Sequence, residues 1–307
     1  MKLGLLTAPF ADTPLIEVAR WASAHGYEQL EVAAWPSGGG ERRRYAGTAH
    51  LPLEDLSASR ASEIVAELAE TGITISALGY YPNNLDPDPE TRRVVNDHTV
   101  AVIEAASKLG VGVVNTFIGA DPALSQDANY DVALEVFPRI VDAATDAGVR
   151  LGIENCPMIF SGDEWPGGKN VAYNPRIWRR MFADFGPTLG LNLDPSHLVW
   201  LMIDPERVVR EFGDRLWHVH AKDLQIDRDG LYEYGSMSAG IGWQVPRLPG
   251  LGEVPWGRFL AALYQAGYDG VVCVEHEDRA FEGTDDLVKQ GFLLARDTLR
   301  PYLPRLD

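Results

Sequence analysis

The sequence has few cysteines, few basic residues and no long apolar run. Cys156 and Cys273 are its two cysteines, too few for a disulfide framework, and both lie in apolar segments that predict reduced core thiols. Basic residues number 27 against 44 acidic ones, a net charge of −17. This charge argues against a nucleic-acid partner, because polyanion binding needs a basic surface. No run of about 18 apolar residues and no apolar leader occurs, so we expect no membrane partner and a cytoplasmic location.

A glycine-rich phosphate turn and a linker between two halves are also absent. Thr7-Ala8-Pro9-Phe10 stands after the first predicted strand, where a doubly wound nucleotide-binding sheet would carry that turn. The chain instead alternates short apolar runs with segments of helical periodicity, one of them at 131–147. Glycine ends five of these helical segments, namely Gly26, Gly72, Gly110, Gly148 and Gly267. Eight strand–helix units predict one (β/α)8 TIM-barrel domain over 1–307, with strands at 2–6, 29–33, 74–78, 113–117, 150–153, 189–193, 216–219 and 270–274.

Acidic and imidazole side chains stand at the ends of four consecutive predicted strands. They are Glu154, Asp194, His220 and Glu275. The carboxyl ends of barrel strands lie together and carry the active site, so these four should converge. A helix cap or a solvated loop residue is the alternative for each one alone. Three carboxylates and an imidazole make an oxygen-rich set, which predicts a divalent metal, with Mn²⁺ first and Mg²⁺ or Co²⁺ as alternatives.

Two neighbouring features are less specific. His218 and His220 lie two apart on the seventh predicted strand, so they point to the same face. His218 is interpreted as a residue that orients a metal ligand. Glu31 starts the tip region of the second predicted strand, far from the cluster in chain order, and either a solvated carboxylate or a substrate contact fits it.

The motifs around these residues resemble the xylose-isomerase-like TIM barrel superfamily, over almost the whole chain. They are Gly-Ile-Glu154-Asn, Leu-Asp194-Pro-Ser-His197, His218-Val-His220-Ala-Lys222-Asp223, Pro249-Gly-Leu-Gly-Glu-Val-Pro-Trp256 and Val-Glu275-His. Within the superfamily the chain is similar to the sugar phosphate isomerase/epimerase group, which includes ketose 3-epimerases and inosose dehydratases. No segment reads as a phosphate cradle.

The resemblance implies a metal-dependent sugar isomerase or epimerase that removes a proton next to a carbonyl and forms an enediolate. Glu154 and Glu275 would be metal ligands and also the acid and base. His197 would contact a substrate oxygen, and Lys222 would bind another. The partner would be a small sugar or keto-glycoside. The resemblance also suggests homo-oligomers, with a smaller second subunit in glycoside-cleaving members.

Two positions depart from the ketose 3-epimerases. Phe160 replaces a substrate-contacting glutamate and Ile226 replaces an arginine, which argues against a free ketohexose. Lys222-Asp223 resembles a signature of the inosose dehydratases, although Asp223 could instead fix the His220 ring. Together these features favour a lyase as the alternative, either an inosose-type dehydratase or an enzyme that cleaves C- or O-linked 3-keto-glycosides by β-elimination.

The segment 225–247 is a long insertion with Tyr232, Tyr234 and Trp243. It predicts a lid over a larger or aromatic substrate, and a flexible or oligomer-contacting loop is the alternative. Two further classes stay open. An apurinic-site endonuclease shares the barrel but needs more histidines and a basic face. A catalytically inactive binding protein would leave the predicted metal site empty.

Overall fold

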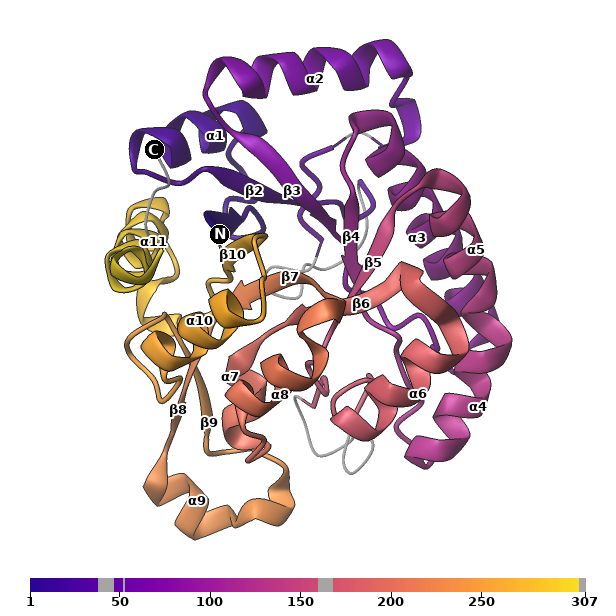
Figure 1. Cartoon of the computed structure of the whole chain (residues 1–307), viewed down its shortest axis with the longest axis vertical. Helices are drawn as coiled ribbons and strands as arrows, with labels where there is room; N and C mark the ends of the chain where they lie inside the picture. The colour runs from indigo at the N-terminus through magenta and orange to yellow at the C-terminus, as the bar shows by residue number, and fades with distance from the viewer. Residues whose placement is uncertain (38–46, 52, 160–167, 304–307) are drawn as a thin grey trace.

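The computed structural model describes residues 1–37, 47–51, 53–159 and 168–303, which contain a closed parallel β-barrel (Figure 1). Neighbouring strands follow the chain from β1 to β7, and β10 closes the barrel between β7 and β1. The strands are β1 (Lys2–Leu6), β2 (Gln29–Ala33), β3 (Thr74–Gly79), β4 (Val113–Thr116), β5 (Arg150–Glu154), β6 (Leu189–Leu193), β7 (Leu216–Ala221) and β10 (Val271–Val274). The predicted TIM barrel is confirmed.

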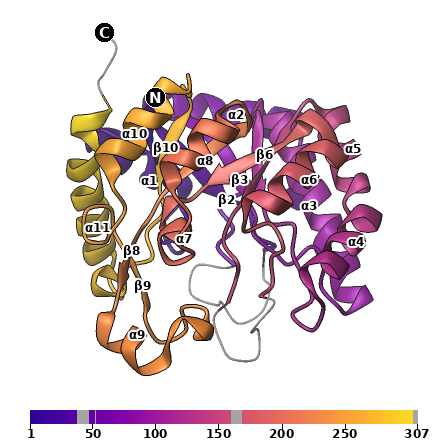
Figure 2. The same cartoon turned by 60° about the horizontal axis from the view of Figure 1, so that its bottom comes forward.

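Helices surround the barrel and bury their apolar faces against its strands (Figures 1 and 2). They are α1 (Leu15–Ala24), α2 (Ala58–Glu70), α3 (Pro89–Leu109), α4 (Gln126–Val136), α5 (Pro138–Ala147), α6 (Pro175–Phe185), α7 (Pro195–Trp200), α8 (Pro205–Phe212), α10 (Trp256–Gln265) and α11 (Asp285–Leu299). The glycine stops are confirmed, since all five glycines have positive φ angles, such as 67° at Gly110. Both cysteines are buried and free, as expected.

The strands separate an apolar shell from a polar barrel interior. On β7, Val219 packs into the main apolar core, while His218 and His220 are buried on the alternate face. Glu31, Asn115 and Asn192 are also fully buried polar residues on barrel strands. Apolar packing outside the strands thus stabilises a barrel whose interior carries polar groups.

The structure corrects the helix prediction at 131–147. Two helices occupy this region, α4 and α5, and they meet at Phe137. Pro138 follows as the first residue of α5, and a proline disfavours helical continuation through the residue before it and lacks the N–H that would extend the helix. The periodicity continued across the break, which is why the sequence predicted one helix.

A second difference is an arm built from the predicted insertion. β8 (Asp223–Ile226) and β9 (Gln244–Arg247) form an antiparallel pair, and α9 (Arg228–Tyr234) lies between them in the chain. Figure 2 shows this arm projecting beyond the barrel, on the side where α9 is labelled. No helix in the described ranges is long and apolar enough to span a membrane.

Candidate metal and active site

The four residues at the strand ends meet inside the barrel. Glu154 ends β5 and Asp194 follows β6, while His220 belongs to β7 and Glu275 follows β10. His220 Nδ1 lies 3.0 Å from Glu275 Oε2 and 3.7 Å from Glu154 Oε1. The side chains of Asp194 and His220 are fully buried, and that of Glu275 is 13% exposed. The barrel therefore brings three carboxylates and one imidazole together from four strands.

His197 joins Asp194 to this cluster. Its Nε2 lies 3.1 Å from Asp194 Oδ2 and 3.6 Å from Glu154 Oε1. Asp194 is also the N-cap of α7, because its Oδ1 accepts a hydrogen bond from the Ser196 N–H. One carboxylate oxygen thus caps a helix while the other faces the cluster.

Several of the atoms that face one another lack an aligned hydrogen bond. Among the described residues, the buried atoms without such a bond include Glu154 Oε1, Asp194 Oδ2, His197 Nε2 and His220 Nδ1. Each of them has a charged or imidazole neighbour at 3.0–3.7 Å, but buried polar atoms normally make aligned hydrogen bonds, so four without one in the same place call for an explanation. Two triads, Glu154-Asp194-His197 and Glu154-His220-Glu275, also bring their ligand atoms within 4.8 Å of one another. The residues fit a divalent cation.

Lys222 is a buried ammonium among these acids. Its Nζ donates a hydrogen bond to Glu275 Oε2 at 2.9 Å and lies 3.1 Å from Asp194 Oδ2 and 3.2 Å from Glu277 Oε2. Burial opposes the charge, but Glu275, Glu277 and Asp194 outweigh it and raise the pKa of Lys222 well above its usual value. Burial opposes the ionised form of Asp194 too, yet Lys222 and His197 lower the pKa of that carboxyl. The cluster is therefore strongly ionic.

Glu31 reaches the cluster from the other side of the barrel. Its Oε2 lies 2.7 Å from His220 Nε2, and the Tyr81 hydroxyl donates a hydrogen bond to its Oε1. Sequence reasoning left Glu31 open and did not consider Tyr81. Separation along the sequence did not indicate proximity here, because in a closed barrel β2 and β7 face each other across the interior. The usable signal was an acid inside the second strand, with the aromatic pair Tyr80-Tyr81 directly after the third strand.

His218 lies next to the cluster, with its Nδ1 3.7 Å from Glu31 Oε2. Its Nδ1 is 3.0 Å from Asn192 Oδ1, and its Nε2 is 3.3 Å from Ser76 Oγ. Burial lowers the pKa of His218 to about 4, so its ring is neutral near pH 7. Asn192 in turn donates a hydrogen bond to the Tyr81 hydroxyl at 3.1 Å.

Comparisons with known proteins agree with this architecture. The family described as Xylose isomerase-like TIM barrel matches residues 19–298. The chain belongs to this family. Among curated relatives, the uncharacterized protein YfiH of Bacillus subtilis (strain 168) is 30% identical over 91% of this chain and 93% of its own. An inosose dehydratase of Lacticaseibacillus casei is 30% identical over 36% of this chain and 38% of its own.

A solved structure shares the fold. The D-psicose 3-epimerase of Clostridium cellulolyticum H10, crystallised with D-tagatose, superposes with a TM-score of 0.70 at 18% identity. The superposition covers 99% of this chain and 100% of that one. At that identity the likeness shows the barrel alone. The family match and the superposition thus identify the chain as a xylose-isomerase-like TIM barrel.

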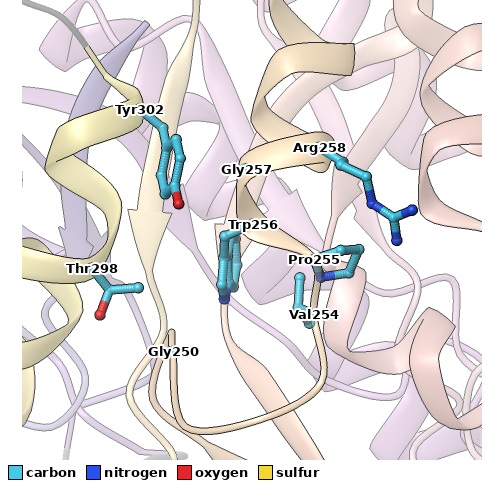
Figure 3. A pocket seen from close by; sticks show the side chains of 8 residues that line it. All are labelled: Gly250, Val254, Pro255, Trp256, Gly257, Arg258, Thr298 and Tyr302. Atoms are coloured by element: carbon cyan, nitrogen blue, oxygen red, sulfur yellow. The ribbon is translucent and has the colours of Figure 1, made fainter.

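Asp223 fixes the loop that runs from Gly250 to Trp256. Its carboxylate accepts hydrogen bonds from the N–H groups of Leu224, Gly250 and Val254 and from the Trp256 indole. That occupancy is evidence against the expectation that Asp223 fixes the His220 ring. Figure 3 shows Gly250, Val254 and Trp256 on the wall of a surface pocket of about 380 Å³, between α10 and the end of α11. The residues lining this pocket include none of the clustered acids.

The arm is anchored beside the cluster by one of its aromatic residues. Trp243 is buried and packs edge to face against Trp200, at 6.4 Å between ring centroids. The Trp200 indole donates a long hydrogen bond, 3.4 Å, to His197 Nδ1. Tyr232 and Tyr234 are 90% and 61% exposed, so of the three predicted lid aromatics only Trp243 packs inward. Ile226 ends β8 in the arm, and Phe160 lies outside the described residues.

Proposed function

We propose that this protein is a divalent-metal-dependent enzyme that moves a proton next to a carbonyl of a sugar-like substrate, as an isomerase or epimerase. The observation that carries the proposal is the set of four buried atoms facing one another without aligned hydrogen bonds. Glu154, Asp194, His220 and Glu275 would hold the metal, with Mn²⁺ first and Mg²⁺ or Co²⁺ as alternatives. When bound, the ion would withdraw charge from substrate oxygens and so acidify the neighbouring C–H.

The charges of the cluster support a cation there. Five carboxylates lie within the contact network, against one ammonium and three imidazoles. Buried acids at these separations repel one another unless positive charge lies between them. Lys222 supplies one positive charge, and it contacts only three of the five carboxylates, Asp194, Glu275 and Glu277. The members of the network are Glu31, Glu154, Asp194, Glu275, Glu277, Lys222, His197, His218 and His220.

Glu154 and Glu275 are the residues that we assign to proton transfer. They come from β5 and the end of β10, so they approach the space beside His220 from different sides. Such an arrangement allows one carboxylate to take a proton on one face of a substrate while the other returns it on the opposite face. His197 Nε2, which has no aligned hydrogen bond, is then available for a substrate oxygen.

The second candidate is a lyase on a keto-sugar or keto-inositol. Lys222 favours it, because a buried ammonium 2.9 Å from Glu275 can stabilise the negative charge on a departing oxygen next to the base. The inosose dehydratase relative points to the same chemistry. Proton removal would be common to both reactions, and only the fate of the neighbouring substituent differs.

NMR in D₂O separates these reactions. The Mn²⁺-loaded protein is incubated with free ketohexoses, an inosose and a 3-keto-glycoside, and manganese is removed before spectra are recorded. Deuterium in a retained carbon skeleton supports an isomerase or epimerase. Loss of water or of the aglycone supports a lyase. If Mn²⁺-loaded protein retains no divalent ion on metal analysis, the enzyme proposal fails.

A further inference from the structure

We propose that Glu31 is a positioning residue that fixes the His220 ring so that Nδ1 points to the metal. The inference rests on the proposed metal site. His220 Nε2 lies 2.7 Å from Glu31 Oε2, while Nδ1 faces Glu275 and Glu154 at 3.0 and 3.7 Å. An ionised carboxylate only accepts hydrogen bonds, so Nε2 keeps its proton against Glu31. Nδ1 is then the nitrogen left for a metal, as in carboxylate–histidine–metal arrangements generally.

Glu31 is itself held in place. The Tyr81 hydroxyl donates to its Oε1, while Oε2 faces His220. Gly79 on the neighbouring strand β3 leaves room for the Glu31 carboxylate, because a Cβ at position 79 would lie 2.5 Å from Glu31 Oε1. The carboxylate is therefore fixed in orientation by contacts to both of its oxygens.

A separate metal at Glu31, His218 and His220 is the competing interpretation, since their ligand atoms lie within 4.8 Å of one another. The contacts argue against it. Both oxygens of Glu31 already have partners, and His218 Nδ1 faces the Asn192 amide oxygen at 3.0 Å. The atoms of Glu154, Asp194 and His220 at the proposed site have no such aligned hydrogen bonds. Glu31 therefore acts behind the ligand.

Mn²⁺ titration followed by electron paramagnetic resonance tests this role on the full chain. Glu31→Gln keeps the shape but offers an amide that can donate to Nε2, so we expect about 10- to 100-fold weaker Mn²⁺ binding. Tyr81→Phe removes one anchor of Glu31 and should weaken binding less, in the same direction. Asp278→Asn is the matched control, because Asp278 is a buried carboxylate that binds Arg247 and the Leu248 N–H. It should lower the melting temperature and leave the Mn²⁺ Kd within about twofold.

Nitrogen-15 NMR of histidine-labelled, Zn²⁺-loaded protein reads the ring directly. The wild type should show a metal-bound Nδ1 and a proton on Nε2, and Glu31→Gln should lose this pattern in part of the population. The inference is wrong if Glu31→Gln has the same Mn²⁺ Kd and the same histidine ring spectrum as the wild type. If Glu31→Gln does not fold, an unchanged Mn²⁺ Kd in Tyr81→Phe overturns the inference instead. Absence of Mn²⁺ binding by the wild type would instead refute the proposed function.

Discussion

Replacing Lys222 with methionine removes the one ammonium that contacts three acids of the cluster. Lys222 Nζ lies within 2.9–3.2 Å of Glu275, Asp194 and Glu277, and its own side chain is 4% exposed. Methionine keeps most of the apolar length of the side chain. The substitution therefore removes the ammonium that these buried carboxylates share and changes the packing little.

The expected cost follows from that burial. Removing one partner of a buried ion pair destabilises a protein by about 3–5 kcal/mol, because the other charge stays buried. Glu275 and Glu277 are 13% and 28% exposed, so water screens them, and we expect the lower end, about 3 kcal/mol. An unfolding entropy of about 2.1 cal/mol/K per residue gives about 0.6 kcal/mol per kelvin for this chain, hence a fall of about 5 °C in Tm.

Thermal unfolding by circular dichroism measures this change, first in EDTA and then with Mn²⁺. In EDTA the variant should melt about 5 °C below the wild type. At a hundredfold excess over its Kd, Mn²⁺ adds about 2.7 kcal/mol to either protein. At one Mn²⁺ concentration the gap should narrow, because the variant lacks the competing ammonium and should bind the ion more tightly. Lys289→Met is the control, since Lys289 pairs with Asp285 on the surface and should cost less than about 1 kcal/mol. Equal Tm values for the variant and the wild type in EDTA would refute the reasoning.

Three further outcomes are expected. Glu154→Gln should lower turnover in the D₂O assay by about 10²- to 10⁴-fold while the circular dichroism spectrum stays native, and full activity would remove Glu154 from acid–base catalysis. Trp243→Ala should loosen the arm and raise KM, because Trp243 packs on the Trp200 that bonds His197; unchanged amide exchange across 223–247 would contradict this. His218 has a pKa of about 4, below its unfolded value of about 6.5, so the unfolded chain binds the proton first and stability falls as pH drops from 6.5 towards 4. Urea unfolding should show a loss of about 2 kcal/mol between pH 7 and 5 that His218→Gln reduces, and an equal loss in both proteins would disprove the assignment.

The barrel was predictable because its signals are local and repeated. Apolar runs of four to six residues, helical periodicity and a glycine stop recur along the chain, and each reflects a short-range preference. The break between α4 and α5 at Phe137 was not predicted, because the apolar spacing continues across it and only Pro138 marks it. The β8–β9 pair was not predicted for another reason. Pro246 and the polar residues around it do not form the apolar alternation that is typical of a strand.

The candidate site was predictable only where chemistry coincides with a strand end. Glu154, Asp194, His220 and Glu275 follow apolar runs directly, so the topology alone implies that they meet. Glu31 lies in the middle of β2 and follows no apolar run, its partner is 189 positions away, and its role depends on which ring nitrogen it contacts. Orientation of that kind is set by packing in three dimensions, and no spacing in the chain encodes it.

The same contacts suggest how the cluster is kept rigid. Asp194 uses Oδ1 to cap α7 and turns Oδ2 inward, where it has no aligned hydrogen bond. His220 is held in a similar way, because its Nε2 contacts Glu31 while its Nδ1 faces Glu275. In each residue the bonded atom fixes the side chain, and the other atom is thereby aimed at a common centre. A site built in this way loses little side-chain entropy when a cation binds, because the ligands are already held by the contacts behind them. Mutating the supporting contacts should therefore weaken metal binding even though no ligand is lost.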